Sequence, residues 1–504
     1  RYTDRDNQSF DGYGYQFNRG GVVFTDPRII EKVIADNAQY FDRSTGRERG
    51  VAFFSQASYG FRNRYILSGT LNYEGSNQLG RSRKARWLPT WNISGRWNVT
   101  NEHFLPATHA LSNLSFRLSY GLIAGLNNIG NALPIMISTI TPRFRNQDNE
   151  RLIRILSLQN SDLTWEKVYE TNFGTDIGFL SNAISLSVDL YQKNSKDLLD
   201  IVRTSGMGGE LNKYANDASM TTRGVELVLD TRNFKTEDFT WSTSVNFAYF
   251  NQEITSLANA SNSVFNLVRE TGGNVLGNPR NTLYSYDFAG LNSQGMPLLN
   301  LKGGSRDYKD IDFQDRDNIL SYLKKEGAVD PNITGGLSNT FRYKNWELNF
   351  LITMQAGNKI RKAPLYKGAG YDDLSVFPRE FKNRWVAPGD EALTQIPGIV
   401  SQRTLNEENK AYISRAYSAY NHSTARVVDG SFVRMKSISL SYTFDKEVLE
   451  NLNLGNLTLR LQASNPFLIY AHKDLNGQDP EFFRSGGVAY PITPQYTFTI
   501  NLGI

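Results

Sequence analysis

The chain has 504 residues and a formal net charge of +5 at neutral pH, with 39% hydrophobic and 21% charged residues. It contains no cysteine, which excludes a disulfide framework and a thiolate metal site. No apolar run approaches the roughly 18 residues of a transmembrane helix, and no basic surface runs through a nucleic-acid recognition fold.

The first part of the chain holds the best helical pattern and the main basic cluster. The segment DPRIIEKVIADNAQYF, residues 26–41, has the 3.6-residue apolar period of a short helix. The segment GRSRKARW, residues 80–87, gathers basic side chains. It is typical of a solvated hairpin loop, and the alternative is a patch that binds anionic lipid or ligand.

Alternation of apolar and polar residues, the signal of a β-strand, dominates the chain. This pattern predicts about fourteen strands. The clearest are LSFRLSY at 114–120, AISLSVDLY at 183–191, TWSTSVNFAYF at 240–250, NWELNFLITMQ at 345–355, SISLSYTF at 437–444, LTLRLQAS at 457–464 and YTFTINL at 496–502. One residue, Thr243, interrupts the apolar face of its strand. We therefore expect an all-β fold.

Strand length and polar-face composition favour a membrane barrel over a soluble sheet. Ten residues tilted by about 45° cross roughly 23 Å, close to the apolar band of an outer-membrane barrel. The polar faces are rich in Ser, Thr, Asn and Gln, where a soluble sandwich carries many Lys and Glu. We expect Ile438, Leu440 and Tyr442 to face lipid, and Ser439 and Ser441 to face a hydrated lumen. The alternative is a large soluble all-β protein.

Strand ends and connections fit the same interpretation. Four tryptophans near strand ends predict interfacial girdles: Trp91, Trp97, Trp241 and Trp346. Tight turns are predicted at Arg62-Asn63 and Lys344-Asn345. Other connections are very long, at roughly 122–165, 255–333 and 356–429. Short turns on one side and long loops on the other are typical of outer-membrane barrels.

The long loops carry the candidate binding residues. We predict Tyr366, Tyr371 and Trp385 as partner or substrate contacts, because aromatic side chains dominate interface cores. Such side chains stack on sugars, pack a peptide, or pack the loops against a lid protein. The alternative is that the 356–429 loop folds down into its own lumen.

No residue pattern points to catalysis, a cofactor or a metal. The four histidines lack HExxH spacing or a paired carboxylate. The acidic segment YKDIDFQDRDNI, residues 308–319, fails the EF-hand spacing, since Asp315 and Ser321 occupy the positions of the required Gly and Glu. We therefore expect no enzymatic activity, and a chemistry of binding and gating.

An ordered series of segments carries a resemblance to a known family. The segments are YILSGTLNYEGSNQLG at 65–80, WLPTWNISGRWNVTNEHFL at 87–105, LSFRLSYG at 114–121, DLTWEKVYETNFGTDIGF at 162–179, TTRGVELVLD at 221–230, FAGLNSQGMPLL at 288–299, NRWVAPGDEALTQIPGI at 383–399, DGSFVRMKSISLSYTF at 429–444 and QDPEFF at 478–483. In this order they resemble the SusC/RagA family, the TonB-dependent outer-membrane transporters of Bacteroidota. The resemblance runs from about residue 50 to the C-terminus.

The resemblance implies an architecture and a location in the bacterial outer membrane. Residues 1–504 would be the C-terminal part of a transmembrane antiparallel β-barrel of about 22 strands, with the three long connections as extracellular loops. The plug domain and the N-terminal barrel strands are not recognisable here, so we expect them outside this chain. The first strand should then pair with residues beyond it.

The resemblance also implies a function. It is TonB-dependent uptake of oligosaccharides or oligopeptides together with a SusD-like surface lipoprotein, with TonB acting through the plug. The alternative is a SusC-like barrel that serves as a structural subunit of a larger outer-membrane complex without transport. Neither function involves nucleic acid.

Overall fold

The structure is a computed structural model that describes most, but not all, of the chain. The described residues are 1–12, 27–28, 31–32, 41–77, 86–125, 135–142, 149–157, 160, 163–203, 212–257, 264–301, 304, 307–311, 319–366, 377–401, 410–450, 454–481 and 493–503. The predicted helix at 26–41 and the basic cluster at 80–87 lie mostly outside these residues. No helix among the described residues is long and apolar enough to cross a membrane.

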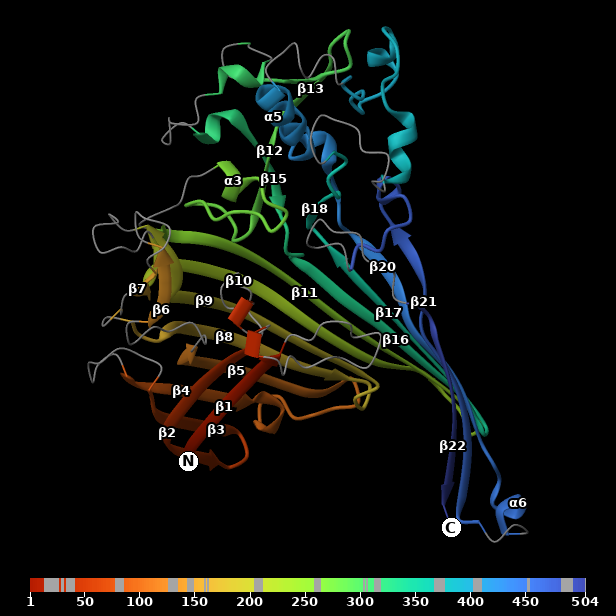
Figure 1. The fold of residues 1–504 in the computed structure, drawn as a ribbon. Coiled ribbons are helices and arrows are strands. Elements are labelled where there is room, and N and C mark those ends of the chain that lie inside the picture. Colours follow the sequence, from red (N-terminus) through yellow and green to blue (C-terminus); the bar gives the residue numbers. More distant parts are fainter. Residues whose placement is uncertain are drawn as a thin grey trace.

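One large antiparallel sheet dominates the described residues (Figure 1). Its fourteen strands follow one another in chain order, and each pairs only with its neighbours. The strands are β1 Tyr2–Gly12, β2 Phe41–Phe61, β3 Tyr65–Ser76, β4 Trp87–Asn98, β5 Leu111–Gly125, β8 Glu166–Phe179, β9 Ile184–Arg203, β10 Asn212–Lys235, β11 Phe239–Leu257, β16 Ile333–Tyr343, β17 Trp346–Ala356, β20 Phe432–Thr443, β21 Asn456–Ala471 and β22 Gln495–Gly503. The predicted all-β class is confirmed.

The two ends of the sheet differ in their connections. At one end, β2 and β3 are joined by three residues, and Arg62 and Asn63 both have left-handed backbone conformations. Strands β16 and β17 are joined by Lys344 and Asn345 alone. At the opposite end run the long connections. The predicted asymmetry is therefore confirmed, and we call the two ends the short-turn end and the long-loop end.

The register of the late strands sorts the side chains onto two faces. Leu348, Leu440, Leu461 and Phe498 pair in one row across β17, β20, β21 and β22. The adjacent row in the same four strands is polar and consists of Asn349, Ser439, Gln462 and Thr497. Side chains alternate between faces along a strand, so one face is apolar and the other polar, as predicted.

Aromatic rings line the apolar face at the short-turn end. Trp97 stacks on Tyr65 with ring centroids 6.4 Å apart, and Trp346 lies 4.8 Å from Tyr442. Trp241, which stacks on Phe341, is also near a strand end, so three of the four tryptophans lie where predicted. The prediction for Trp91 is wrong. It lies in the middle of β4, because that strand begins four residues earlier, at Trp87.

The polar interruption at Thr243 is compensated on the neighbouring strand. Thr243 pairs with Asn339, and the Thr243 hydroxyl donates a hydrogen bond of 2.6 Å to Asn339 Oδ1. The indole Nε1 of Trp241 donates to the same oxygen at 2.9 Å. Polar groups on an apolar face are costly unless they are hydrogen-bonded, and Thr243 and Asn339 meet this requirement by bonding to each other.

The long connections have secondary structure of their own. Residues 122–165 include the hairpin of β6 Ile135–Pro142 and β7 Asn149–Ser157. The other two contain β12 Thr282–Tyr286, β13 Phe288–Leu291, β14 Pro297–Leu299, β15 Leu323–Ala328, β18 Lys359–Arg361, β19 Val427–Asp429, α3 Val264–Leu267 and α5 Lys410–Asn421. Helix α6 Lys446–Glu450 lies at the short-turn end. Short 3₁₀ helices are Val99–Asn101, Tyr308–Asp310, Ile319–Tyr322, Arg379–Asn383, Asp390–Ala392, Thr424–Arg426 and Lys473–Leu475.

The two longest connections fold together into one body beyond the long-loop end of the sheet (Figure 1). We call the described residues of 264–332 and 357–431 the loop module. An isolated parallel β-bridge joins Tyr286 to Ser423, and the Phe288 backbone N–H donates a hydrogen bond to Thr424 Oγ1 at 3.1 Å. Because each contact crosses from one connection to the other, the predicted separate loops form a common core.

The sheet is open. Among the described residues, β1 pairs with β2 alone and β22 with β21 alone, so these two strands are its edges. Figure 1 shows both termini at the lower side of the view, opposite the loop module. The expectation that the chain does not close on itself as a complete barrel is confirmed for the described residues.

Candidate functional site

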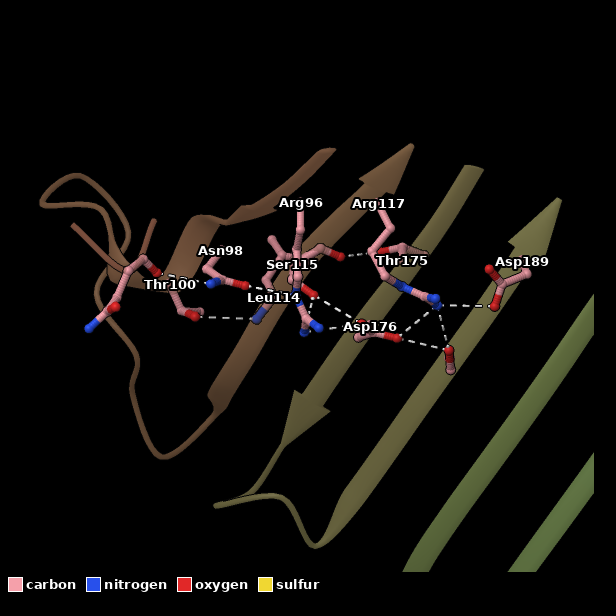
Figure 2. Close-up of polar contacts among 11 residues, drawn as sticks. Arg96, Asn98, Thr100, Leu114, Ser115, Arg117, Thr175, Asp176 and Asp189 are labelled. Atoms are coloured by element: carbon pink, nitrogen blue, oxygen red, sulfur yellow. Dashed lines mark hydrogen bonds and ion pairs between the residues drawn. The ribbon is translucent and has the colours of Figure 1, made fainter. Parts of the chain in front are cut away.

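Four neighbouring strands carry a charged network on the polar face of the sheet (Figure 2). We call it the polar ladder. Its members are Arg96 on β4, Ser115 and Arg117 on β5, Asp176 on β8, and Ser187 and Asp189 on β9. Apolar residues such as Trp97, Phe116, Ile177 and Val188 alternate with them and point to the other face, so the ladder follows from the period of two.

Asp176 is the centre of the polar ladder. Its carboxylate accepts hydrogen bonds from Ser115 at 3.1 Å and Ser187 at 2.8 Å, and it pairs with Arg96 at 3.3 Å and Arg117 at 3.1 Å. Arg117 Nη2 also contacts Asp189 Oδ2 at 3.0 Å. Two guanidinium groups and two carboxylates therefore balance in charge across the four strands.

Gly174 makes possible the contact between Arg117 and Asp189, which spans an intervening strand. It lies on β8 directly between Arg117 and Asp189 in the same row. A Cβ at position 174 would come within 2.6 Å of Asp189 Oδ1 and 2.9 Å of Arg117 Cζ. The absent side chain lets the guanidinium of β5 reach across β8 to the carboxylate of β9.

The sequence pattern placed Arg117 and Asp189 on the polar face but did not indicate that they meet. Their pairing depends on the register of β5, β8 and β9, which no local pattern encodes. Chemically, the ladder offers charged donors and acceptors on a hydrated wall. Its two serine hydroxyls donate to a carboxylate, Asp176, that two guanidinium groups also contact.

The loop module has an aromatic core that contains one predicted site residue. Tyr366 is buried against Phe381, Tyr417 and Tyr420, with ring centroids 5.0 Å apart for Tyr366 and Tyr417. Its hydroxyl donates to the Pro397 carbonyl. Burial raises the pKa of the Tyr366 phenol and raises that of Tyr420 to about 12. Tyr366 thus stabilises the loop from within, and its predicted partner contact stays a prediction.

Buried arginines connect the strands of the loop module. Arg361 donates from Nη2 to the Tyr284 carbonyl at 2.7 Å and from Nη1 to the Ser423 carbonyl at 3.2 Å. Burial lowers the pKa of Arg361 to about 10, so it remains charged at neutral pH. Arg426 pairs with Glu380 at 2.7 Å. The Arg361–Tyr284 contact joins the two long connections, whereas the contacts to Ser423 and Glu380 lie within the second one. All three are charge-assisted hydrogen bonds.

The second predicted site residue, Trp385, anchors an exposed tip. Its ring lies against the backbones of Gly295 and Gly398, where added Cβ atoms would come within 2.4 and 2.6 Å of it. Its Nε1 donates to Glu391 Oε2 at 3.0 Å. The backbone N–H of Trp385 also donates to the Ile396 carbonyl, next to the Pro397 that binds Tyr366. The structure therefore brings Tyr366 and Trp385 to one segment.

The tip itself, residues 385–393, is held by internal hydrogen bonds and is apolar at its surface. The backbone N–H groups of Ala387 and Val386 donate to Asp390 Oδ2 and hold the pKa of that carboxyl below its ordinary value. Val386 is 66% exposed and Leu393 is 85% exposed. Sequence reasoning missed this pair, although Val386 directly follows a predicted contact, Trp385. The third predicted residue, Tyr371, lies outside the described residues.

The structure describes only some of the acidic and histidine residues that the sequence analysis considers as metal ligands or catalytic groups. Within the described ranges, no three His, Asp or Glu side chains cluster as metal ligands. Most of the acidic segment 308–319 lies outside those ranges. His422 is held inside the loop module by the Ser418 carbonyl at 2.8 Å, and burial lowers the pKa of its imidazole.

Comparison with known proteins gives one family and several relatives. A sequence profile described as "TonB dependent receptor-like, beta-barrel" matches residues 1–353. The TonB-dependent receptor SusC of Bacteroides thetaiotaomicron is 25% identical over 99% of this chain and 47% of its own length. The TonB-dependent receptor P39 of Formosa agariphila is 25% identical over 95% of this chain and 49% of its own. The chain thus spans about half the length of these curated relatives.

Among solved structures, the RagAB peptide transporter is similar over the whole chain. The TM-score is 0.78 at 21% sequence identity, and the match covers 100% of this chain and 52% of that one. At this identity the match supports the fold alone, and it places the whole of this chain on about half of a longer one.

Proposed function

The chain belongs to the TonB-dependent receptor-like β-barrel family of the bacterial outer membrane, and we propose that it forms the C-terminal wall of a nutrient importer. The cargo would be an oligosaccharide or an oligopeptide. A SusD-like surface lipoprotein would close over the long-loop end, and TonB would act through a plug outside residues 1–504. No step in this process forms or breaks a covalent bond.

The observation that carries this proposal is the division of the sheet into an apolar and a polar face. In an outer-membrane barrel the apolar face contacts lipid and the polar face lines the lumen. The polar ladder then becomes a charged part of the lumen wall near the short-turn end. Its guanidinium and carboxylate groups, together with the rows of Ser, Thr, Asn and Gln, suit a hydrated passage for hydrogen-bonding solutes.

The substrate class rests on this wall chemistry and on the relatives. Sugars and peptides both present many hydroxyl or amide groups, which rows such as Asn349, Ser439 and Gln462 can bind through hydrogen bonds. One similar structure is that of a peptide transporter, and that likeness supports the oligopeptide half of the proposal.

The loop module supports the proposed lipoprotein partner. The tip at 385–393 presents two exposed apolar side chains on a segment fixed by hydrogen bonds to Asp390 and Glu391. A preorganised apolar projection is what protein interfaces use, because little conformational entropy is lost on binding. We propose Val386 and Leu393 as the contacts, with Trp385 positioning them and Tyr366 supporting the segment behind. Tyr371 remains a proposed contact in the same loop.

Uptake by cells that express the full-length receptor and its lipoprotein tests the proposed transport. Labelled oligosaccharides and oligopeptides of matched size would be supplied with and without a protonophore. We expect one class to accumulate, and accumulation to stop when the proton gradient is removed. A receptor that assembles with its lipoprotein but accumulates neither class would contradict transport and favour a structural role.

Copurification of the lipoprotein tests the tip as the docking surface. The variants Val386→Asp and Leu393→Asp should lower recovery of the lipoprotein with the receptor, because a charge would be buried at the contact. Leu276→Asp is the matched control, since Leu276 is also an exposed apolar residue of the loop module but lies away from the tip. Equal recovery for all three variants would exclude the tip.

A further inference from the structure

The apolar face has a groove at the short-turn end, between β2 and β8. It is formed by two adjacent rows of the sheet. The outer row contains Phe61, Tyr65, Trp97 and Phe116, and the inner row contains Tyr59, Leu67, Gly95, Leu118 and Phe173. These residues line a hollow of about 440 Å³, within the range of ligand-binding clefts.

Gly95 is the reason for the hollow. It is flanked in its row by Leu67 and Leu118. An added Cβ at Gly95 would meet no other atom within 4 Å. A larger residue here would fill the groove without displacing protein atoms, so the missing side chain at this position helps to keep the groove open.

The walls of the groove are fixed by a carboxylate beyond the strand ends. Glu102 Oε1 accepts a hydrogen bond from the Tyr65 hydroxyl at 2.6 Å and one from Trp97 Nε1 at 3.2 Å. Its other oxygen pairs with Arg64 at 3.1 Å. The side chain of Glu102 is 9% exposed, so these contacts are shielded from water. Two rings of the outer row are therefore held in place before any ligand arrives.

A cation stands at the edge of the groove. The Arg62 guanidinium carbon lies 5.1 Å from the centroid of the Phe61 ring, which lines the groove. Arg62 is exposed, and within the described part of the chain it has no carboxylate partner. Its neighbour Arg64, by contrast, is neutralised by Glu102. An apolar hollow with one uncompensated guanidinium at its mouth matches a molecule with an apolar chain and an anionic head.

We propose that this groove binds a single phospholipid of the outer membrane. One acyl chain lies over Gly95 between Leu67 and Leu118, and the headgroup phosphate is held by Arg62. In a barrel of this family the apolar face contacts lipid, and the short turns lie on the periplasmic side. At that interface the lipid headgroups and the aromatic girdle lie at the same depth in the membrane. The site is independent of the lumen and of the proposed transport substrate.

Native mass spectrometry of the full-length receptor in mild detergent tests the apolar half of the site. The variant Gly95→Leu fills the groove. The matched control is Gly69→Leu. Gly69 lies on β3, on the same apolar face of the sheet as Gly95, but it does not line the groove. An added Cβ at Gly69 would also have no atom within 4 Å. We expect wild type and Gly69→Leu to retain one phospholipid and Gly95→Leu to retain none. Equal retention by the two leucine variants would overturn the proposal.

Titration with phosphatidylglycerol, after delipidation, tests the headgroup contact. Loss of a charge-assisted hydrogen bond in Arg62→Gln should weaken lipid binding about tenfold. Inorganic phosphate alone should not compete, because the acyl chain supplies the rest of the affinity. Barrel assembly, judged by heat-modifiable migration on gels, should be unchanged in every variant. Unchanged affinity in Arg62→Gln, or full competition by inorganic phosphate, would refute the assignment.

Discussion

At the scale of single residues, Gly174 decides whether the polar ladder can form. The variant Gly174→Ala would push a methyl group against Asp189 Oδ1 and the Arg117 guanidinium. We expect a loss of about 1–3 kcal/mol in the free energy of unfolding, the usual cost of overpacking a fitted site. Denaturant titration of the purified receptor would measure it.

The control for Gly174 lies on the same polar face. Gly60 pairs with Ile66 in β3, and an added Cβ there would meet nothing within 4 Å. The variant Gly60→Ala should change stability by no more than about 1 kcal/mol, because it restricts the unfolded chain without a clash. A similar loss in both alanine variants would show that backbone effects, and not the ladder, account for the result.

Leu440 and Ser439 test the two faces at neighbouring positions. Leu440 lies in the apolar row with Leu348 and Leu461, whereas Ser439 pairs with Asn349 and Gln462. Replacing Leu440 with Arg near the bilayer midplane should cost about 2–4 kcal/mol, while Ser439→Arg should be tolerated in a hydrated lumen. Reversible folding into lipid vesicles gives both values. A larger cost for Ser439→Arg would reverse the assignment of the faces.

At the scale of elements, the loop module should respond to acid through Glu380. Burial alone would raise the pKa of this carboxyl, but Arg426 and Lys362 outweigh that effect, and the pKa lies below its ordinary value of 4.5. A lowered folded-state pKa means that the stabilisation is complete above pH 4.5 and is lost as the pH falls through the folded value. We therefore expect the module to become protease-sensitive in acid.

The variant Glu380→Gln isolates this contribution. It should make the loop module more sensitive at neutral pH and remove most of the acid dependence, because Arg426 remains buried without its carboxylate partner. The exposed neighbour Lys382 provides a control, and Lys382→Ala should behave as wild type. If the acid transition is unchanged in Glu380→Gln, a titratable group other than Glu380 causes it.

The elements also show which parts of the structure local sequence can predict. The strands were predictable because alternation is local, as in LSFRLSY, where Leu118 and Arg117 fall on opposite faces. The polar ladder was not, since Arg117 meets Asp189 only through register across β8 and through Gly174. Within the loop module, helix α5 was not predicted, although its buried residues Ile413, Ala416, Tyr417 and Tyr420 follow helical spacing.

The candidate site was predicted less completely than the fold. The sequence identified an aromatic long loop but could not separate rings that support it from rings that form its surface. Tyr366 is buried among other rings, whereas Val386 and Leu393 are exposed. This distinction depends on packing between segments as distant as 295 and 398, which only the folded loop module brings together around Trp385.

At the scale of the whole molecule, the two edge strands must find partners in the membrane. Unpaired backbone groups cost several kcal/mol each in lipid, so β1 and β22 should pair with strands outside residues 1–504 in the full-length receptor. Hydrogen exchange should show their amides protected as strongly as those of the central strand β9. Direct pairing of β1 with β22 in the full-length protein would contradict this prediction and indicate a smaller barrel.

The central claim is that one face of this sheet contacts outer-membrane lipid and the other lines an aqueous lumen. The absence of cysteine from these 504 residues favours site-directed spin labelling of single cysteine variants at positions 438–441 and 497–500, in the full-length receptor reconstituted in lipid. We predict that accessibility to oxygen peaks at 438, 440, 498 and 500, and that accessibility to a water-soluble nickel chelate peaks at 439, 441, 497 and 499. Equal accessibility along each strand, or peaks in the opposite phase, would contradict the barrel-wall assignment.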